Sequence, residues 1–128
     1  MQLFELVTDV DCLDCYWDKE TDTIFFVVPE GMAKRAIGKE GWIVNVLRNK
    51  LGKNVRIIEH SSNLEKFVRN MISYVKNIEE KSIDGGKVIY INVEKFARPR
   101  VLGRNRRNEV IYKRILGRHF NIKDIIIK

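Results

Sequence analysis

The feature that most constrains the fold of this 128-residue chain is an internal repeat. When Gly38 is aligned with Gly103, residues 35–39 (RAIGK) face residues 100–104 (RVLGR). At the same offset residues 51–53 (LGK) face residues 116–118 (LGR). Self-similarity of this kind indicates that each copy is one structural unit with the same order of elements. The problem of the fold therefore reduces to the order of elements within one copy.

Each copy reads as a helix, a hairpin, two helices and a final strand. The first copy places these elements near residues 3–7, 17–28, 32–37, 42–51 and 55–58. In the second copy a helix follows the cap cluster 61–63, a hairpin turns at Asp84-Gly85-Gly86, Pro99 suits a first helical turn, and residues 125–127 end the pattern. The sequence predicts an α+β fold of two tandem domains, residues 1–60 and 61–128, each with a three-stranded sheet.

The loop between the paired helices of the first copy reads Gly38-Lys39-Glu40-Gly41. Glycine lets a backbone approach a ligand closely, and the helix that follows offers unpaired N–H groups. Lys39 adds a charge at the tip, and Lys34 and Arg35 lie one turn back. A lone G-x-x-G motif is weak. Here its position between two helices, after a hairpin and before a strand, favours a site for consecutive phosphates.

The second loop reads Gly103-Arg104-Asn105-Arg106, so an arginine replaces the closing glycine. Two hypotheses follow: the second unit holds a polyanion by side chains, which the arginines favour, or it has lost the clamp and serves as a docking wall. Several cations crowd this region. The candidate binding residues in the second copy are Arg98, Arg100, Gly103, Arg104, Asn105, Arg106, Arg107 and Lys113.

The formal net charge of +7 is unevenly placed. Residues 87–128 carry twelve Lys or Arg and three acids, whereas residues 1–30 carry one Lys and eight acids. A basic region favours a polyanionic partner, although a solvated charged surface is the alternative.

The sequence contains no run of about 18 apolar residues that would predict a membrane span, and the first residues do not resemble a signal peptide. With only two cysteines, the chain is expected to be cytoplasmic.

Other motifs are weaker. Cys12 and Cys15 form a C-x-x-C, but zinc needs four ligands and no second such pair exists, so incidental cysteines are expected and no metal site is predicted. The aromatic residues are expected mainly in the core, with Trp42 beside the first loop as the exception to watch. The acids of residues 9–22 are expected to be solvated. No catalytic pairing or cofactor motif emerges, so an enzyme is not expected.

The repeated element order, together with residues 36–41 (AIGKEG) and 51–59 (LGKNVRIIE), resembles the archaeal NusA-like transcription factors. Residues 116–124 (LGRHFNIKD) resemble their second domain. The resemblance implies two type II KH domains, whose loops grip about four nucleotides of a single strand. It also implies binding of single-stranded RNA in transcription elongation, termination or antitermination, with RNA polymerase or the nascent-transcript complex as partner. The alternatives are a KH protein of ribosomes or RNA processing, and an interaction scaffold that no longer binds RNA.

Overall fold

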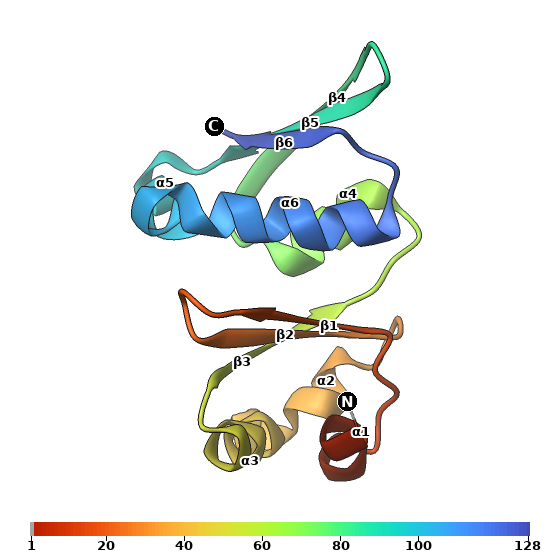
Figure 1. Cartoon of the computed structure of the whole chain (residues 1–128), viewed down its shortest axis with the longest axis vertical. Helices are drawn as coiled ribbons and strands as arrows, with labels where there is room; N and C mark the ends of the chain where they lie inside the picture. Colours follow the sequence, from red (N-terminus) through yellow and green to blue (C-terminus); the bar gives the residue numbers. More distant parts are fainter. Residues whose placement is uncertain (1) are drawn as a thin grey trace. The chain divides into compact units, whose positions relative to one another are not determined.

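The computed structural model describes residues 2–128 and divides into two compact units, the first ending at Ser62 and the second beginning at Asn63. Each unit has the same order of elements (Figure 1). The first contains α1 (Gln2–Thr8), β1 (Asp14–Asp18), β2 (Thr23–Val28), α2 (Ala33–Ile37), η1 (Lys39–Gly41), α3 (Trp42–Leu51) and β3 (Asn54–Glu59). The second contains α4 (Leu64–Met71), β4 (Val75–Ile83), β5 (Gly86–Val93), η2 (Lys95–Ala97), α5 (Arg98–Leu102), η3 (Arg104–Arg106), α6 (Arg107–His119) and β6 (Asp124–Ile127).

The first unit has a three-stranded sheet of order β1-β2-β3, with all three helices on one side of it (Figure 1). β1 pairs antiparallel with β2, because a four-residue turn joins them, and β2 pairs parallel with β3 across the helical connection. Phe4 of α1 stacks on Phe26 of β2 with ring centroids 4.3 Å apart. Leu47 of α3 is buried in the same core. The helices that carry the loop between α2 and α3 are thus packed through this core.

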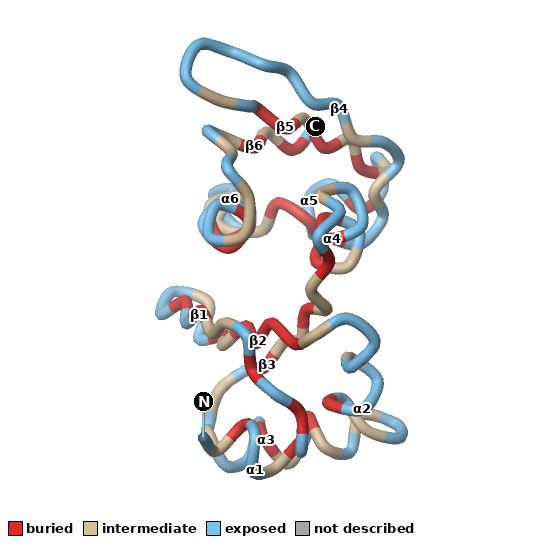
Figure 2. The backbone as a smooth tube through the Cα atoms, turned by 90° about the vertical axis from the view of Figure 1, so that its right-hand side faces the viewer, coloured by how far each residue is buried: buried red, intermediate tan, exposed pale blue. Residues whose placement is uncertain are grey.

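The second unit repeats this topology, with sheet order β4-β5-β6 and antiparallel then parallel pairing. In β5 Ile89, Ile91 and Val93 are buried, whereas Tyr90 and Asn92 between them are only partly buried; Val88 is buried as well, and Figure 2 colours the strand by burial. Ile111 and Ile115 of α6 are fully buried, at the i, i+4 spacing of a helix face. One face of this sheet therefore carries the core and the other is open.

The predicted fold class, two tandem type II KH domains with three-stranded sheets, is confirmed by this architecture and topology. Local signals acted as expected. Asn63 caps α4, because its side chain accepts a hydrogen bond of 2.9 Å from the Lys66 N–H, and Pro99 lies in the first turn of α5.

Two expectations in the first hairpin were wrong. Asp18 is buried, with 1% of its surface exposed, because its carboxylate accepts hydrogen bonds from the backbone N–H and the hydroxyl of Thr21 and so closes the turn. Trp17 is half exposed, with the Lys53 Nζ over its ring at 4.7 Å. Asp18 is thus buried because it closes the turn, although acids are usually exposed. Trp17 stays half exposed and contacts a lysine, although aromatic residues usually lie in the core.

Candidate nucleic-acid interface

The first glycine loop reverses the chain between α2 and α3 through a run of left-handed residues. Gly38 ends α2 with φ 79° and ψ 169°, and its N–H donates to the Lys34 carbonyl. Glu40 and Gly41 follow at φ 56° and 75°. The Gly41 N–H donates back to the Gly38 carbonyl at 3.1 Å, which closes the turn. The loop thus delivers the chain directly to the amino end of α3, where the first-turn N–H groups have no acceptor within the helix.

The second loop has the same backbone although its sequence differs. Gly103 has φ 73° and ψ 179°, and Asn105 and Arg106 are left-handed at φ 54° and 58°. The Arg106 N–H donates to the Gly103 carbonyl at 3.2 Å, as its counterpart in the first loop does. The missing glycine therefore does not change the path of the chain.

The two glycine positions differ in what they tolerate. The first has positive φ with ψ near 180°, a region that essentially only glycine adopts. A Cβ on Gly38 would lie 2.6 Å from Ile43 Cγ1, and one on Gly103 would lie 2.8 Å from Asn108 Nδ2. The closing position is ordinary left-handed helix, and a Cβ on Gly41 would meet no atom nearer than 3.8 Å. The first glycine is therefore a requirement of both loops, whereas a side chain can occupy the closing position at a cost in backbone energy.

Arg106 turns its side chain onto its own domain. Its guanidinium donates two hydrogen bonds to the Glu109 carboxylate, at 2.9 and 2.7 Å, and one to the Ile127 carbonyl at 3.2 Å. Glu109 in turn accepts the Ile127 N–H at 2.7 Å. These bonds join the start of α6 to the edge of β6. Burial would raise the pKa of Glu109, but the hydrogen bonds from Arg106 and Ile127 outweigh it and lower the pKa.

The first loop presents both charge and an aromatic surface. Lys39 and Glu40 are exposed at its tip. They line a hollow of about 510 Å³ together with Trp42, Ile43 and Asn45. Trp42 is 69% exposed, which agrees with the expectation that this aromatic residue beside the first loop would lie outside the core. A cation beside an exposed indole is suited to a phosphate and the base next to it.

The other predicted residues of the first loop lie one turn before it on α2. Lys34 is exposed, and Arg35 forms an exposed ion pair with Asp9 at 2.6 Å. Such a pair contributes little stability and opens readily when a stronger anion approaches. The structure thus brings all six predicted residues of this copy to one end of the first unit.

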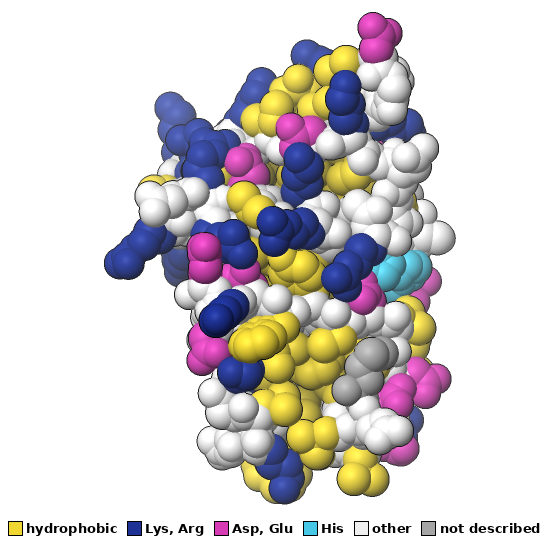
Figure 3. All heavy atoms as spheres, in the orientation of Figure 1, with side chains coloured by type: hydrophobic (Ala, Val, Ile, Leu, Met, Phe, Trp, Pro, Cys, Tyr) yellow, Lys and Arg dark blue, Asp and Glu magenta, His cyan; other side chains and the backbone are white. Residues whose placement is uncertain are grey.

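The predicted cations of the second unit divide into three groups. Arg98 and Arg100 lie on α5, and the Arg100 guanidinium stands 5.7 Å from the centre of the Tyr74 ring. Arg104, Asn105 and Arg106 are all exposed on the loop, although the Arg106 guanidinium is engaged with Glu109 and Ile127 as described. Further along α6, Arg107 is half buried, and Lys113 pairs with Asp124 at 3.2 Å. In Figure 3 Lys and Arg side chains gather over the α5 end of this unit.

Sequence reasoning missed several residues around this end. Glu109, the partner of Arg106, could have been found from its i, i+3 spacing after an arginine. Lys76, Lys95 and Lys128 lie near Arg98, but they come from three separate segments. No local sequence signal connects them.

The C-x-x-C pair lies in the first unit, at the start of β1. Neither Cys12 nor Cys15 forms a disulfide, and burial raises the pKa of the Cys12 thiol to about 11. In the absence of a metal Cys12 is therefore a protonated core residue at neutral pH. Among residues 2–128 no three His, Cys, Asp or Glu side chains gather as a metal site would need.

Comparison with known proteins places the chain in a family. A protein of Methanocaldococcus jannaschii named "Probable transcription termination protein NusA" is 34% identical over 124 residues, which span 95% of this chain and 67% of that protein. A protein of the same name from Halococcus morrhuae is 31% identical, over 96% of this chain and 88% of its own length. The chain belongs to the archaeal NusA-like family. The family resemblance inferred from the repeat is thereby confirmed.

The crystal structure of APE1850 has the same fold as this NusA-like chain. The two agree with a TM-score of 0.81 at 30% sequence identity, over 99% of this chain and 94% of the other. No protein-family model matches the sequence. Within the described part of the NusA-like chain, residues 2–128, every helix is too short or too polar to cross a bilayer.

Proposed function

We propose that this NusA-like chain binds single-stranded RNA, chiefly through the loop of its first unit, while it acts in transcription termination or elongation. The observation that carries the proposal is the loop of residues 38–41. The Gly41 N–H bonds to the Gly38 carbonyl and closes the turn, and the chain then enters the amino end of α3. Lys39 and the exposed Trp42 stand at this point.

Each part of this loop suits one part of a nucleotide. The glycines leave room for a sugar-phosphate backbone, and Lys39 together with the first turn of α3 favours the phosphate charge. The Trp42 ring offers a surface on which an unstacked base can lie. A duplex keeps its bases stacked inside, so this combination favours a single strand.

The second unit would contribute differently. Its loop has the same backbone path, but Arg106 is held by Glu109 and Ile127. The exposed cations left for RNA at the loop tip include Arg104, with Arg98 and Arg100 on α5. Contact by these side chains would be electrostatic, and it would tolerate many RNA sequences.

The role in transcription rests on the name of the relatives, "Probable transcription termination protein NusA". A NusA-like protein with this role would meet RNA polymerase or the nascent transcript as its partner. The names do not favour a role in ribosomes or RNA processing, and a scaffold without RNA binding would fail the experiment that follows.

The test is fluorescence anisotropy with a labelled single-stranded RNA and a duplex of matched length, at several salt concentrations. Single-stranded RNA should bind more tightly than duplex, and its affinity should fall steeply as salt rises. Equal affinity for the two would contradict the groove hypothesis. No binding of either RNA would leave the scaffold alternative in place.

A loop variant connects this binding to the first unit. Lys39→Asp with Glu40→Asp keeps both glycines and places two short carboxylates where a phosphate would lie. Affinity should fall roughly 5- to 150-fold, which corresponds to about 1–3 kcal/mol for like charges in a partly screened site. Circular dichroism checks that the variant is folded. An unchanged affinity would place the RNA elsewhere on the protein.

A further inference from the structure

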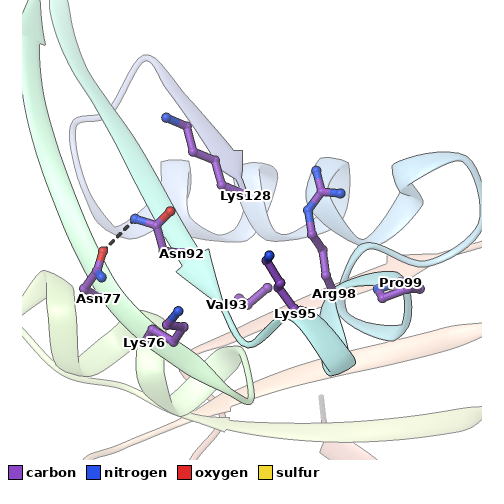
Figure 4. A pocket seen from close by; sticks show the side chains of 8 residues that line it. All are labelled: Lys76, Asn77, Asn92, Val93, Lys95, Arg98, Pro99 and Lys128. Carbon is purple, nitrogen blue, oxygen red and sulfur yellow. Dashed lines mark hydrogen bonds between the residues drawn. The ribbon is translucent and has the colours of Figure 1, made fainter.

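The second sheet borders a hollow in whose lining Arg98 is the one predicted binding residue. It has a volume of about 820 Å³ and lies where β5 ends and α5 begins (Figure 4). Four cationic side chains line it: Lys76, Lys95, Arg98 and Lys128. Asn77, Asn92, Val93 and Pro99 complete the lining, so no Asp or Glu side chain is part of it.

The cations of this hollow are not neutralised by the protein. Lys76, Lys95 and Arg98 are exposed, and within residues 2–128 none of the three forms an ion pair. Lys128 contacts the ring of Tyr90 at 4.7 Å through its Nζ, which leaves its charge in place. Four like charges around one hollow repel one another, and an anion between them relieves that repulsion.

The walls of the hollow are held in place by hydrogen bonds. Arg69 donates to the Lys76 carbonyl at 3.3 Å, and the Asn92 amide donates to the Asn77 side-chain oxygen at 2.6 Å. The Val93 N–H donates to the Lys128 carbonyl at 3.1 Å. The positions from which the lysines project are therefore set before a ligand arrives, which lowers the entropic cost of binding.

The two segments that carry Lys76 and Lys95 also present an exposed aromatic pair. Tyr74, two residues before Lys76, and Phe96, the neighbour of Lys95, contact edge to face with centroids 5.2 Å apart. Phe96 is 69% exposed and Tyr74 47%. Arg100 stands over the Tyr74 ring. Large exposed rings next to unpaired cations are the combination with which proteins hold single-stranded nucleic acids, because phosphates meet the cations and bases stack on the rings.

We infer that this hollow is a second RNA contact, in which Lys76, Lys95 and Lys128 hold phosphates and Phe96 offers a stacking surface, separate from both glycine loops. The inference rests on the proposed RNA binding and extends it to a place on the protein that the loops do not include. The hollow lies at the start of α5, and the second loop lies at its end. The five residues of α5 separate the two by about 8 Å. One strand can therefore pass from one to the other.

The test compares two double variants of the full chain for binding to a single-stranded RNA longer than the two loops can cover. Lys76→Gln with Lys95→Gln removes two cations from the hollow. Lys19→Gln with Lys50→Gln removes the same charge from exposed positions of the first unit that belong to neither site. Arg98 is left unchanged because it also belongs to the candidate loop interface.

The hollow variant should bind more weakly than the control. Each phosphate contact on a single strand contributes about 0.7 to the slope of log affinity against log salt. The slope should therefore flatten by about 1.4, and affinity near 0.1 M salt should fall about 25-fold. Phe96→Ala should weaken binding at least about fivefold, whereas Phe96→Tyr, which keeps a ring, should bind as the unchanged protein does.

The outcomes separate this inference from the proposed function. If the unchanged chain binds no RNA, the proposed function fails and the inference fails with it. If the unchanged chain binds RNA and the hollow variant binds as the charge-matched control does, only the inference is overturned. Poly-L-glutamate is the probe for a protein partner: binding of it that depends on Lys76 and Lys95, with RNA binding unaffected, would overturn the RNA assignment and indicate an acidic protein segment.

Discussion

The contact between Arg106, Glu109 and β6 predicts how the second loop keeps its shape without a closing glycine. Arg106 adopts a left-handed backbone, which is unfavourable for a residue with a Cβ. Glu109 holds both the Arg106 guanidinium and the Ile127 N–H. Replacing Glu109 by alanine removes both contacts at once. Replacing it by glutamine keeps an oxygen for the N–H but removes the charge and one of the two oxygens that accept from Arg106.

The expected magnitude follows from the burial of Ile127. Ile127 is 1% exposed, and its backbone N–H donates to the Glu109 carboxylate at 2.7 Å. A buried N–H without an acceptor costs about 1–3 kcal/mol, so Glu109→Ala should lower the free energy of unfolding by about that amount. For a domain of this size each 1 kcal/mol corresponds to roughly 4–8 °C in Tm. Glu109→Gln should cost less, because the amide oxygen can still accept the bond.

Urea unfolding followed by far-UV circular dichroism measures both variants. Tryptophan fluorescence is unsuitable, because both tryptophans, Trp17 and Trp42, lie in the first unit. The midpoint should fall at constant m-value, further for alanine than for glutamine. A Glu109→Ala protein as stable as the unchanged chain would refute the reasoning, since Glu109 would then contribute nothing to the second unit.

The same contact predicts a dependence on pH. The folded protein lowers the pKa of Glu109 below its ordinary value of 4.5, because Arg106 and the Ile127 N–H stabilise the carboxylate. The unfolded state thus binds the proton more readily, and the stabilisation is complete above about pH 4.5 and disappears as pH falls through the folded pKa. The stability difference between the unchanged chain and Glu109→Gln should therefore shrink below this pH.

Three further predictions concern the loops and the cysteines. Gly38→Ala should destabilise the first unit by about 1–3 kcal/mol in thermal or urea unfolding, because its backbone is strained for any side chain and a Cβ would lie 2.6 Å from Ile43 Cγ1; a neutral outcome would mean that the loop adopts another path. Arg106→Gly should reduce RNA affinity modestly and the salt slope by about one phosphate contact if the side chain holds RNA; unchanged or increased affinity would support the internal role seen in the structure. Protein purified without chelator should contain well under one zinc per chain by elemental analysis, because within residues 2–128 no three possible ligands gather; one tightly bound zinc per chain would contradict this.

The repeat, the element order and the glycine loops could be read from the sequence because each depends on residues close together in the chain. Apolar periodicity and turn residues decide where a helix or hairpin forms, and the caps at Asn63 and Pro99 act within a single turn. The first unit's loop lies within one such local stretch. Its candidate residues, from Lys34 to Gly41, could therefore be named together. The exceptions were Asp18 and Trp17, whose contacts depend on how the hairpin closes.

The side-chain partners in the second unit were decided by tertiary structure alone. The sequence shows that Arg106 replaces a glycine, but only the pairing of β6 beside β5 brings the Ile127 backbone to Glu109, where the Arg106 guanidinium bonds to both. The hollow likewise exists because the register of the sheet places Lys76 and Lys128 beside Lys95. Long-range strand pairing is not encoded in any local pattern, since it depends on which segments the core brings together. The sequence by itself therefore determined the architecture and the family, whereas the fold decided which of its many cations remain free to meet a ligand.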